Sequence, residues 1–401
     1  MQTDRADNRF LIPFINLGHF VDHLAMLIFP TVVIGLAREW NQPYSELLPY
    51  ALGGFIAFGG FALPAGWLGD HWGRYKMMVV FFFGIGACLF LTGFAQSPLQ
   101  IGIGLFCVGL FAAIYHPVAT AMLVADPKRI GRVLGWNGLW GNFGLAAAAL
   151  VAGALMDFSG WRAAFFVPGA LTIGAGVAFL LLVKDPGKVA KTGKKVGLGI
   201  DARTMWRIFG IVVIATVCGG IIFNATTISM PKVFHERMAK FTQTGLGIGM
   251  LVSIVYCIAA LAQVLVGTLI DRIDLKSIFV PVALLQIPFL FLAGTLDGVA
   301  MLMVSVLMML MVFGQIPLND AVIARYTRDE YRARVYSVRY VLSLGVAAVA
   351  VPLIAFLHRT TGGFQNVFTV LSLLAALTLA AALLLPSRKE MEARRVATQP
   401  A

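Results

Sequence analysis

The sequence predicts an all-α membrane protein with twelve transmembrane helices in two pseudo-symmetric six-helix bundles. Composition is the first observation behind this prediction, because 59% of the residues are hydrophobic and only 12% are charged, against about 25% charged in soluble domains. The lengths of the apolar runs are the second. A hydrocarbon core about 30 Å thick needs roughly 20 apolar residues per helix, whereas barrel strands alternate over only about 10.

Each span is placed by hydropathy. The twelve spans fall at residues 11–37, 46–69, 76–96, 100–124, 134–156, 161–183, 207–230, 245–269, 277–296, 299–323, 335–357 and 364–385. We therefore expect an N-terminal bundle over 1–183, a basic linker over 184–206, and a C-terminal bundle with a short tail over 207–401.

Lysine and arginine are distributed unevenly between the two sets of loops. With the N-terminus inside, 25 of the 31 Lys and Arg residues fall in inside segments. This bias predicts that both termini are cytoplasmic in a bacterial inner membrane. It also explains the net charge of +12 without a nucleic-acid partner. The four cysteines lie far apart inside apolar runs, so we expect no metal site and no cofactor.

An internal repeat is the third observation. Four landmark pairs are separated by 201 residues: Gly18 and Gly219, Pro30 and Pro231, Gly66 and Gly267, Asp70 and Asp271. Pro117 and Pro317 are 200 apart. A single register over half the chain indicates a duplicated six-helix unit with parallel halves, a plan typical of secondary transporters.

The loop after the second predicted span reads GWLGDHWGRYK. Its residues resemble the signature loop of the major facilitator superfamily, and a degraded copy, GTLIDRIDLK, follows the eighth span. The residues concerned are Gly66, Asp70, Gly73, Arg74 and Lys76 in the first copy and Gly267, Asp271 and Arg272 in the second. The resemblance implies a monomeric carrier whose loop stabilises one state of alternating access and meets the eleventh helix. The alternative is that these residues only fix the orientation of the chain in the membrane.

Polar residues deep in the first span suggest a proton-handling site. Asp22 lies roughly 16 Å from the predicted cytoplasmic face. Asn16, His19 and His23 share one helix face, and Asp22 lies beside His19. Charges at this depth are costly and are functional candidates by default.

His116 in the fourth span lies at a comparable depth and joins this candidate set. A carboxylate beside imidazoles can exchange protons as solvent access changes. A neutral hydrogen-bond network that only locks helix packing is the alternative.

The first and fourth spans also resemble the fosmidomycin-resistance branch of the superfamily. His19, Pro30, His116 and Pro117 match that branch. In that branch an aspartate follows the histidine by four residues. Here Asp22 follows His19 by only three, and His23 stands at the fourth position. The arginine typical of drug–proton antiporters is also absent, because Leu105 stands four residues before Gly109.

The second half offers mostly neutral polar groups, from which we expect part of the substrate cavity: Asn224, Gln315 and Asn319. Arg339 either meets an anionic substrate or pairs with Asp320. The sequence thus predicts a non-enzymatic, proton-coupled transporter of a small organic molecule, with export by antiport preferred. Uptake of a metabolite, vitamin or organic anion by symport is the alternative.

Overall fold

The computed structural model describes residues 8–123, 130–187, 202–326 and 329–386. Every regular element in these ranges is a helix, with no strand among them, which confirms the predicted all-α class. Two compact units divide the chain: Met1–Lys191 with Ile228–Ile254, and Thr192–Thr227 with Val255–Ala401. The predicted boundaries of the two bundles and of the linker remain predictions, and most of that linker lies outside the described residues.

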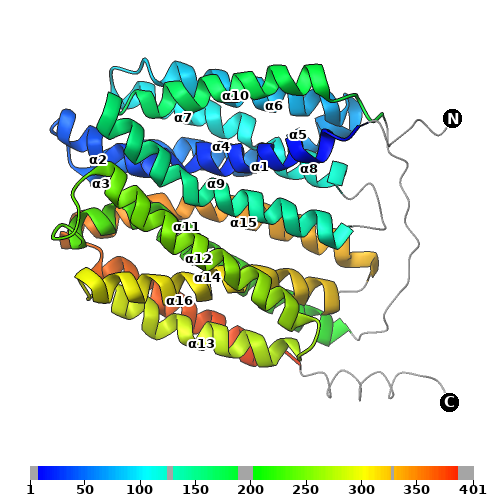
Figure 1. Ribbon diagram of the computed structural model, residues 1–401. Helices are drawn as coiled ribbons and strands as arrows, with labels where there is room; N and C mark the ends of the chain where they lie inside the picture. Colours follow the sequence, from blue (N-terminus) through cyan, green and yellow to red (C-terminus); the bar gives the residue numbers. More distant parts are fainter. Residues whose placement is uncertain (1–7, 124–129, 188–201, 327–328, 387–401) are drawn as a thin grey trace, which may run out of the picture. The chain divides into compact units, whose positions relative to one another are not determined.

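The first unit contains the helices labelled α1 to α10 in Figure 1. Their bounds are α1 Leu11–Leu27, α2 Phe29–Glu39, α3 Tyr44–Leu47, η2 Leu48–Ala51, α4 Leu52–Gly60, α5 Ala62–His71, α6 Arg74–Thr92, α7 Pro98–Ala112, α8 Tyr115–Leu123, α9 Ile130–Ser159 and α10 Ala163–Leu182. The later helices are α11 Ala202–Arg237, α12 Gly245–Ile270, α13 Leu275–Ala293, α14 Gly298–Tyr326, α15 Asp329–Thr361 and α16 Gln365–Leu383. Of these, α11 and α12 each contribute to both units.

The observed helices agree with the predicted spans. Ten helical segments among the described residues are long and apolar enough to cross a membrane. Tyr44–Gly60 and Ala62–His71, bent by 41°, make an eleventh if they form one span. The predicted span at 335–357 lies on α15, whose described apolar part is the shorter segment Gly345–Thr361. The chain is therefore a multi-pass membrane protein.

Two prolines break the spans that carry the candidate site. Pro30 lies in the first turn of α2, just after α1 ends at Leu27. Pro117 lies in the first turn of α8, just after α7 ends at Ala112. A proline has no N–H for the carbonyl four residues earlier, which removes one hydrogen bond of the helix at each of these points. The break before α8 leaves His116 in the first turn of a new helix.

Helix packing in the first unit is close and specific. α10 lies along α6, and α9 lies along α1 (Figure 1). α4 packs against α7, where Gly54 faces Gly109. A Cβ atom on Gly109 would overlap the carbonyl oxygen of Gly54, and a Cβ on Gly54 would lie 2.8 Å from the carbonyl oxygen of Leu105. Backbone therefore meets backbone at this crossing, and only glycine fits there.

The second unit has its own apolar core. α13 packs against α14 and α16. Phe279, Ala283 and Leu318 are fully buried in this core, together with residues of α11 and α16. Such a core needs no polar pairing to hold the helices, because side-chain packing drives helix association inside lipid.

The start of α12 is capped by a carboxylate from α9, within the first unit. Asp157 accepts hydrogen bonds from the backbone N–H groups of Gly245 (3.0 Å) and Leu246 (2.7 Å). The first N–H groups of a helix have no partner inside it, and a carboxylate there also meets the favourable end of the helix dipole. We expect Asp157→Ala to lower the free energy of unfolding by about 1 kcal/mol, and Asp157→Asn by less.

The measurement is the thermal unfolding midpoint of the detergent-purified protein. Asp274→Ala is the matched control, because Asp274 occupies the N-cap position of α13 but its side chain makes no capping hydrogen bond. An equal fall of the midpoint in the control would show that the cap is not the cause.

Candidate functional site

Four ionisable side chains from α1 and α8 meet inside the first unit. His19, Asp22 and His23 lie on α1, and His116 lies on α8. Asp22 is fully buried, and its Oδ2 lies 3.5 Å from Nε2 of His116. Neither carboxylate oxygen of Asp22 accepts a hydrogen bond from the described residues. The structure thus brings together the residues that we predicted as a proton-handling site, and we call these four the His–Asp cluster.

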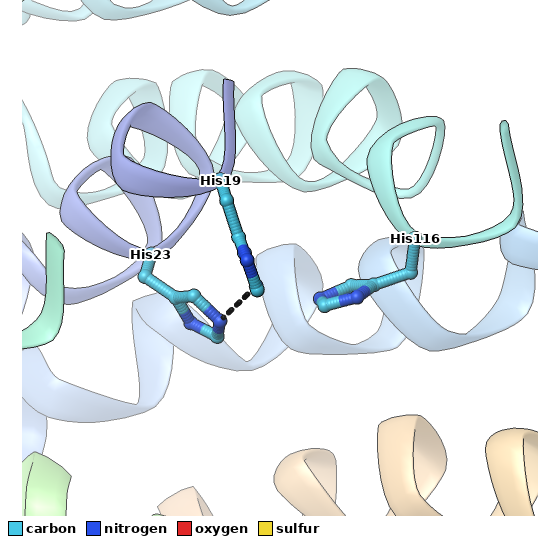
Figure 2. A group of neighbouring side chains, drawn as sticks. All are labelled: His19, His23 and His116. Atoms are coloured by element: carbon cyan, nitrogen blue, oxygen red, sulfur yellow. Dashed lines mark hydrogen bonds between the residues drawn. The ribbon is translucent and has the colours of Figure 1, made fainter. Parts of the chain in front are cut away.

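The three imidazole rings of the cluster face one another (Figure 2). Nε2 of His23 lies 3.1 Å from Nε2 of His19. The ring of His116 approaches edge-on, with its centroid 5.3 Å from that of His19 and 5.7 Å from that of His23. One ring nitrogen from each histidine lies within 4.8 Å of the other two, close enough for a shared metal ion. The cluster can therefore hold cations or exchange protons among neighbouring bases.

The backbone carbonyl of Asn137 and the ring of Tyr115 hold the imidazole of His19 in place. Nδ1 of His19 donates to the backbone carbonyl of Asn137 at 2.7 Å, because a carbonyl can only accept. The side-chain amide of Asn137 donates to Oδ1 of Asn16 at 3.0 Å and to the hydroxyl of Tyr115 at 2.8 Å. Tyr115 donates in turn to the carbonyl of Ile15 and stacks on His19. This network ties α1, α8 and α9 together and orients His19.

Tyr115 and Asn137 were missed by the sequence analysis. Tyr115 directly precedes His116, and Asn137 is one of two asparagines in an apolar span, so each carried a weak signal. Asn16 was predicted as a cavity residue, but here its amide oxygen is a buried acceptor in the network.

Gly141 on α9 allows His19 to occupy its position. A Cβ atom added at Gly141 would lie 2.7 Å from Nε2 and Cε1 of His19. We expect Gly141→Ala to push the ring off its hydrogen bond with Asn137 and to lower the free energy of unfolding by about 1–3 kcal/mol. Gly138→Ala, one turn earlier, is the matched control, because a Cβ there has no atom within 4 Å. Identical thermal midpoints for the two variants would contradict this account.

The predicted signature loop lies between α5 and α6 and contacts α8. Arg74 donates to Asp70 at 2.8 Å and to the carbonyl of Ala121 on α8 at 3.1 Å. Gly73 has a φ of +119°, which favours glycine. A Cβ atom on Gly66 would lie 3.2 Å from Pro117. The loop thus sits on the helix that carries His116, while Lys76 is exposed over the ring of Trp72.

The second copy of the motif is looser. Asp271 and Arg272 are exposed in the turn between α12 and α13. A Cβ atom on Gly267 would have no atom within 4 Å, so this glycine does not mediate a close approach. The tight helix contact of the first copy is thus not repeated in the second.

The predicted neutral cavity residues of the second half lie on α11 and α14, where Gln315 and Asn319 are one helical turn apart and both lie beside Ala215. Gln315 is buried and accepts from the amide of Gln286 at 2.7 Å. Asn224 is half-buried and donates to the carbonyl of Gly220. Asn319 is half-buried beside Phe279, and its amide oxygen accepts no hydrogen bond from the described residues. Asp320 is half-buried on α14, and the side chain of Arg339 lies outside the described part of the chain.

Comparison with known proteins extends over the whole chain. The sequence model of the Major Facilitator Superfamily matches residues 15–255 and again residues 212–400. A puromycin resistance protein of Streptomyces alboniger is 28% identical over 170 residues, which are 42% of this chain and 31% of that protein. A putative niacin/nicotinamide transporter of Bacillus subtilis is 24% identical over 202 residues, 49% of this chain and 50% of that protein. The chain thus matches 31% and 50% of the length of these two relatives.

The fold also matches a solved structure. A bacterial homologue of the human lysosomal transporter Spinster, in an inward-facing and occupied conformation, superposes with a TM-score of 0.74. The match covers 98% of this chain and 97% of that chain at 14% sequence identity. At this identity the similarity shows a common fold and no more.

Proposed function

Because the chain belongs to the major facilitator superfamily, we propose that it is a secondary active transporter that exports a small organic molecule in exchange for protons. Members of this family move solutes rather than catalyse reactions, so the chain is a transporter and not an enzyme. The observation that carries the proton coupling is the buried Asp22 carboxylate 3.5 Å from His116. A buried carboxylate and a partly exposed imidazole can pass a proton between protein and solvent.

In the proposed mechanism, the His–Asp cluster holds a proton in one half of the cycle and releases it in the other. Gly66 on α5 and Arg74 at the start of α6 contact α8, which carries His116 in its first turn. A movement of the α5–α6 loop would therefore be transmitted to the His–Asp cluster through one helix, α8. Asn224, Gln315, Asn319 and Arg339 are the proposed contributors to substrate recognition. We place the protein as a monomer in the bacterial inner membrane, with both termini in the cytoplasm.

Direction of transport is tested with puromycin as the probe, since one relative is a puromycin resistance protein. Export by antiport predicts that everted vesicles accumulate puromycin when their lumen is more acidic than the medium. Dissipating the pH gradient should abolish the accumulation. Vesicles from cells lacking the protein are the control, and equal accumulation in both would refute export of this probe.

Uptake by symport is the second candidate, because another relative is a putative niacin/nicotinamide transporter. It predicts that right-side-out vesicles accumulate nicotinate when the medium is more acidic than the lumen. Accumulation of nicotinate there, without accumulation of puromycin in everted vesicles, would decide for uptake.

A further inference from the structure

We propose that His19, His23 and His116 form a binding site for a divalent transition-metal ion, with Asp22 as the compensating negative charge. This inference goes beyond proton-coupled transport and holds for either direction of transport. It also revises the expectation of no metal site.

The geometry of the three histidines fits a metal ion. Bonds of about 2.0–2.1 Å in a tetrahedral zinc site place the ligand nitrogens about 3.4 Å apart. Nε2 of His19 and Nε2 of His23 already lie 3.1 Å apart. The ligand nitrogen of His116 lies within 4.8 Å of both, so its ring must move inward by on the order of 1 Å. The side chain of His116 is 21% exposed and is therefore not fully enclosed by its neighbours.

The spacing of the histidines along the chain supports the same interpretation. His19 and His23 are four residues apart on α1, which places both imidazoles on one face, as in helical zinc motifs. His116 comes from α8 and faces them from the other side (Figure 2). Two ligands from one helix and a third from another bridge two rigid elements.

A backbone carbonyl prepares His19 to bind a metal. Because Nδ1 of His19 donates to the carbonyl of Asn137, its proton is held on Nδ1. The lone pair of the ring therefore lies on Nε2, which faces His23. Histidine ligands of metals are usually oriented in this way, by a second partner on the nitrogen that does not bind.

The charge around the site also favours a cation. Asp22 is fully buried, and its carboxylate accepts no hydrogen bond from the described residues. A buried carboxylate without hydrogen bonds is costly, and a nearby cation offsets that cost. Its Oδ2 lies 3.5 Å from the His116 ring, so its charge is next to the proposed ion. Three imidazoles and one carboxylate favour Zn²⁺, Ni²⁺, Co²⁺ or Cu²⁺ over Mg²⁺ and Ca²⁺, which prefer oxygen ligands.

The test is a titration of the full chain, purified in detergent without a polyhistidine tag, with Zn²⁺ in a calorimeter. We expect one ion per chain with a dissociation constant in the micromolar range or tighter. His19→Gln, His23→Gln and His116→Gln should each weaken binding at least tenfold, and Asp22→Asn should weaken it as well. Titration with Co²⁺ should give the intense visible absorption of a tetrahedral site, and the three histidine variants should lose it.

His71→Gln is the matched control, because His71 is an exposed histidine on α5 whose Nδ1 bonds the carbonyl of Trp67. It should bind Zn²⁺ like the wild type. The proposal fails if no ion binds at one per chain, or if affinity is unchanged in His23→Gln and His116→Gln variants that keep the wild-type thermal midpoint. This measurement does not depend on transport. A failure to bind Zn²⁺ would therefore not count against proton-coupled transport, and a failure of the vesicle experiments would not count against the metal site.

Discussion

Replacing Asp22 with asparagine is expected to abolish accumulation driven by a pH gradient. Asparagine keeps the shape of the side chain but carries no titratable proton. For one proton per substrate, a gradient of one pH unit supports about tenfold accumulation. The variant should therefore reach only the concentration of the medium. The measurement is accumulation, with and without the gradient, of the probe that wild-type vesicles concentrate.

Downhill exchange of the same probe should survive in Asp22→Asn, because the substitution removes the proton carrier and not the transport path. Asp274→Asn is the matched control, since Asp274 is a carboxylate at the N-cap position of α13, whereas the His–Asp cluster is built from α1 and α8. It should keep the full gradient dependence. Gradient-driven accumulation by Asp22→Asn at the wild-type level would refute proton coupling through this residue.

Gly109→Val is expected to have the largest effect on the fold. The new side chain would project from α7 into the carbonyl group of Gly54 on α4. Because the obstacle is backbone, no rotation of a side chain relieves the overlap, and the two helices must separate. Overpacking of this kind costs about 1–3 kcal/mol, and more where the backbone cannot move. The thermal unfolding midpoint of the purified protein should fall by several degrees, with a larger aggregated fraction in size-exclusion chromatography.

Gly60→Ala provides the comparison on α4 itself. A Cβ atom on Gly60 has no neighbour within 4 Å, so this variant should unfold at the wild-type temperature. A wild-type midpoint for Gly109→Val would mean that α4 and α7 do not pack backbone against backbone at this crossing.

The helical segments could be predicted from the sequence because each span is a local property. An apolar run long enough to cross the bilayer must form a helix, since lipid offers no partner for the backbone groups. The interruptions before Pro30 and Pro117 could not be predicted from proline alone, because Pro231 and Pro317, at the corresponding positions of the repeat, lie inside the continuous helices α11 and α14. The bend at Phe61 was not predicted, since no proline marks that position and Pro64 follows three residues later.

The candidate site could be predicted only in part. His19, Asp22 and His23 share a helix, so their spacing along the chain is enough to place them together. His116 lies 94 residues beyond Asp22, and hydropathy gave only its depth. The contact at 3.5 Å, the acceptor role of the Asn137 carbonyl and the hydroxyl of Tyr115 depend on how α1, α8 and α9 pack.

The sequence by itself determined that this protein is a helical membrane carrier with a repeated plan and with the ionisable groups at membrane depth concentrated in the first half. Those features depend on composition and on positions along one helix. Only the tertiary structure decided that three histidines face one another beside a buried carboxylate. Gly141 on α9 is one reason, because a Cβ atom there would overlap the ring of His19. Such contacts between distant segments leave no periodic signal in the chain.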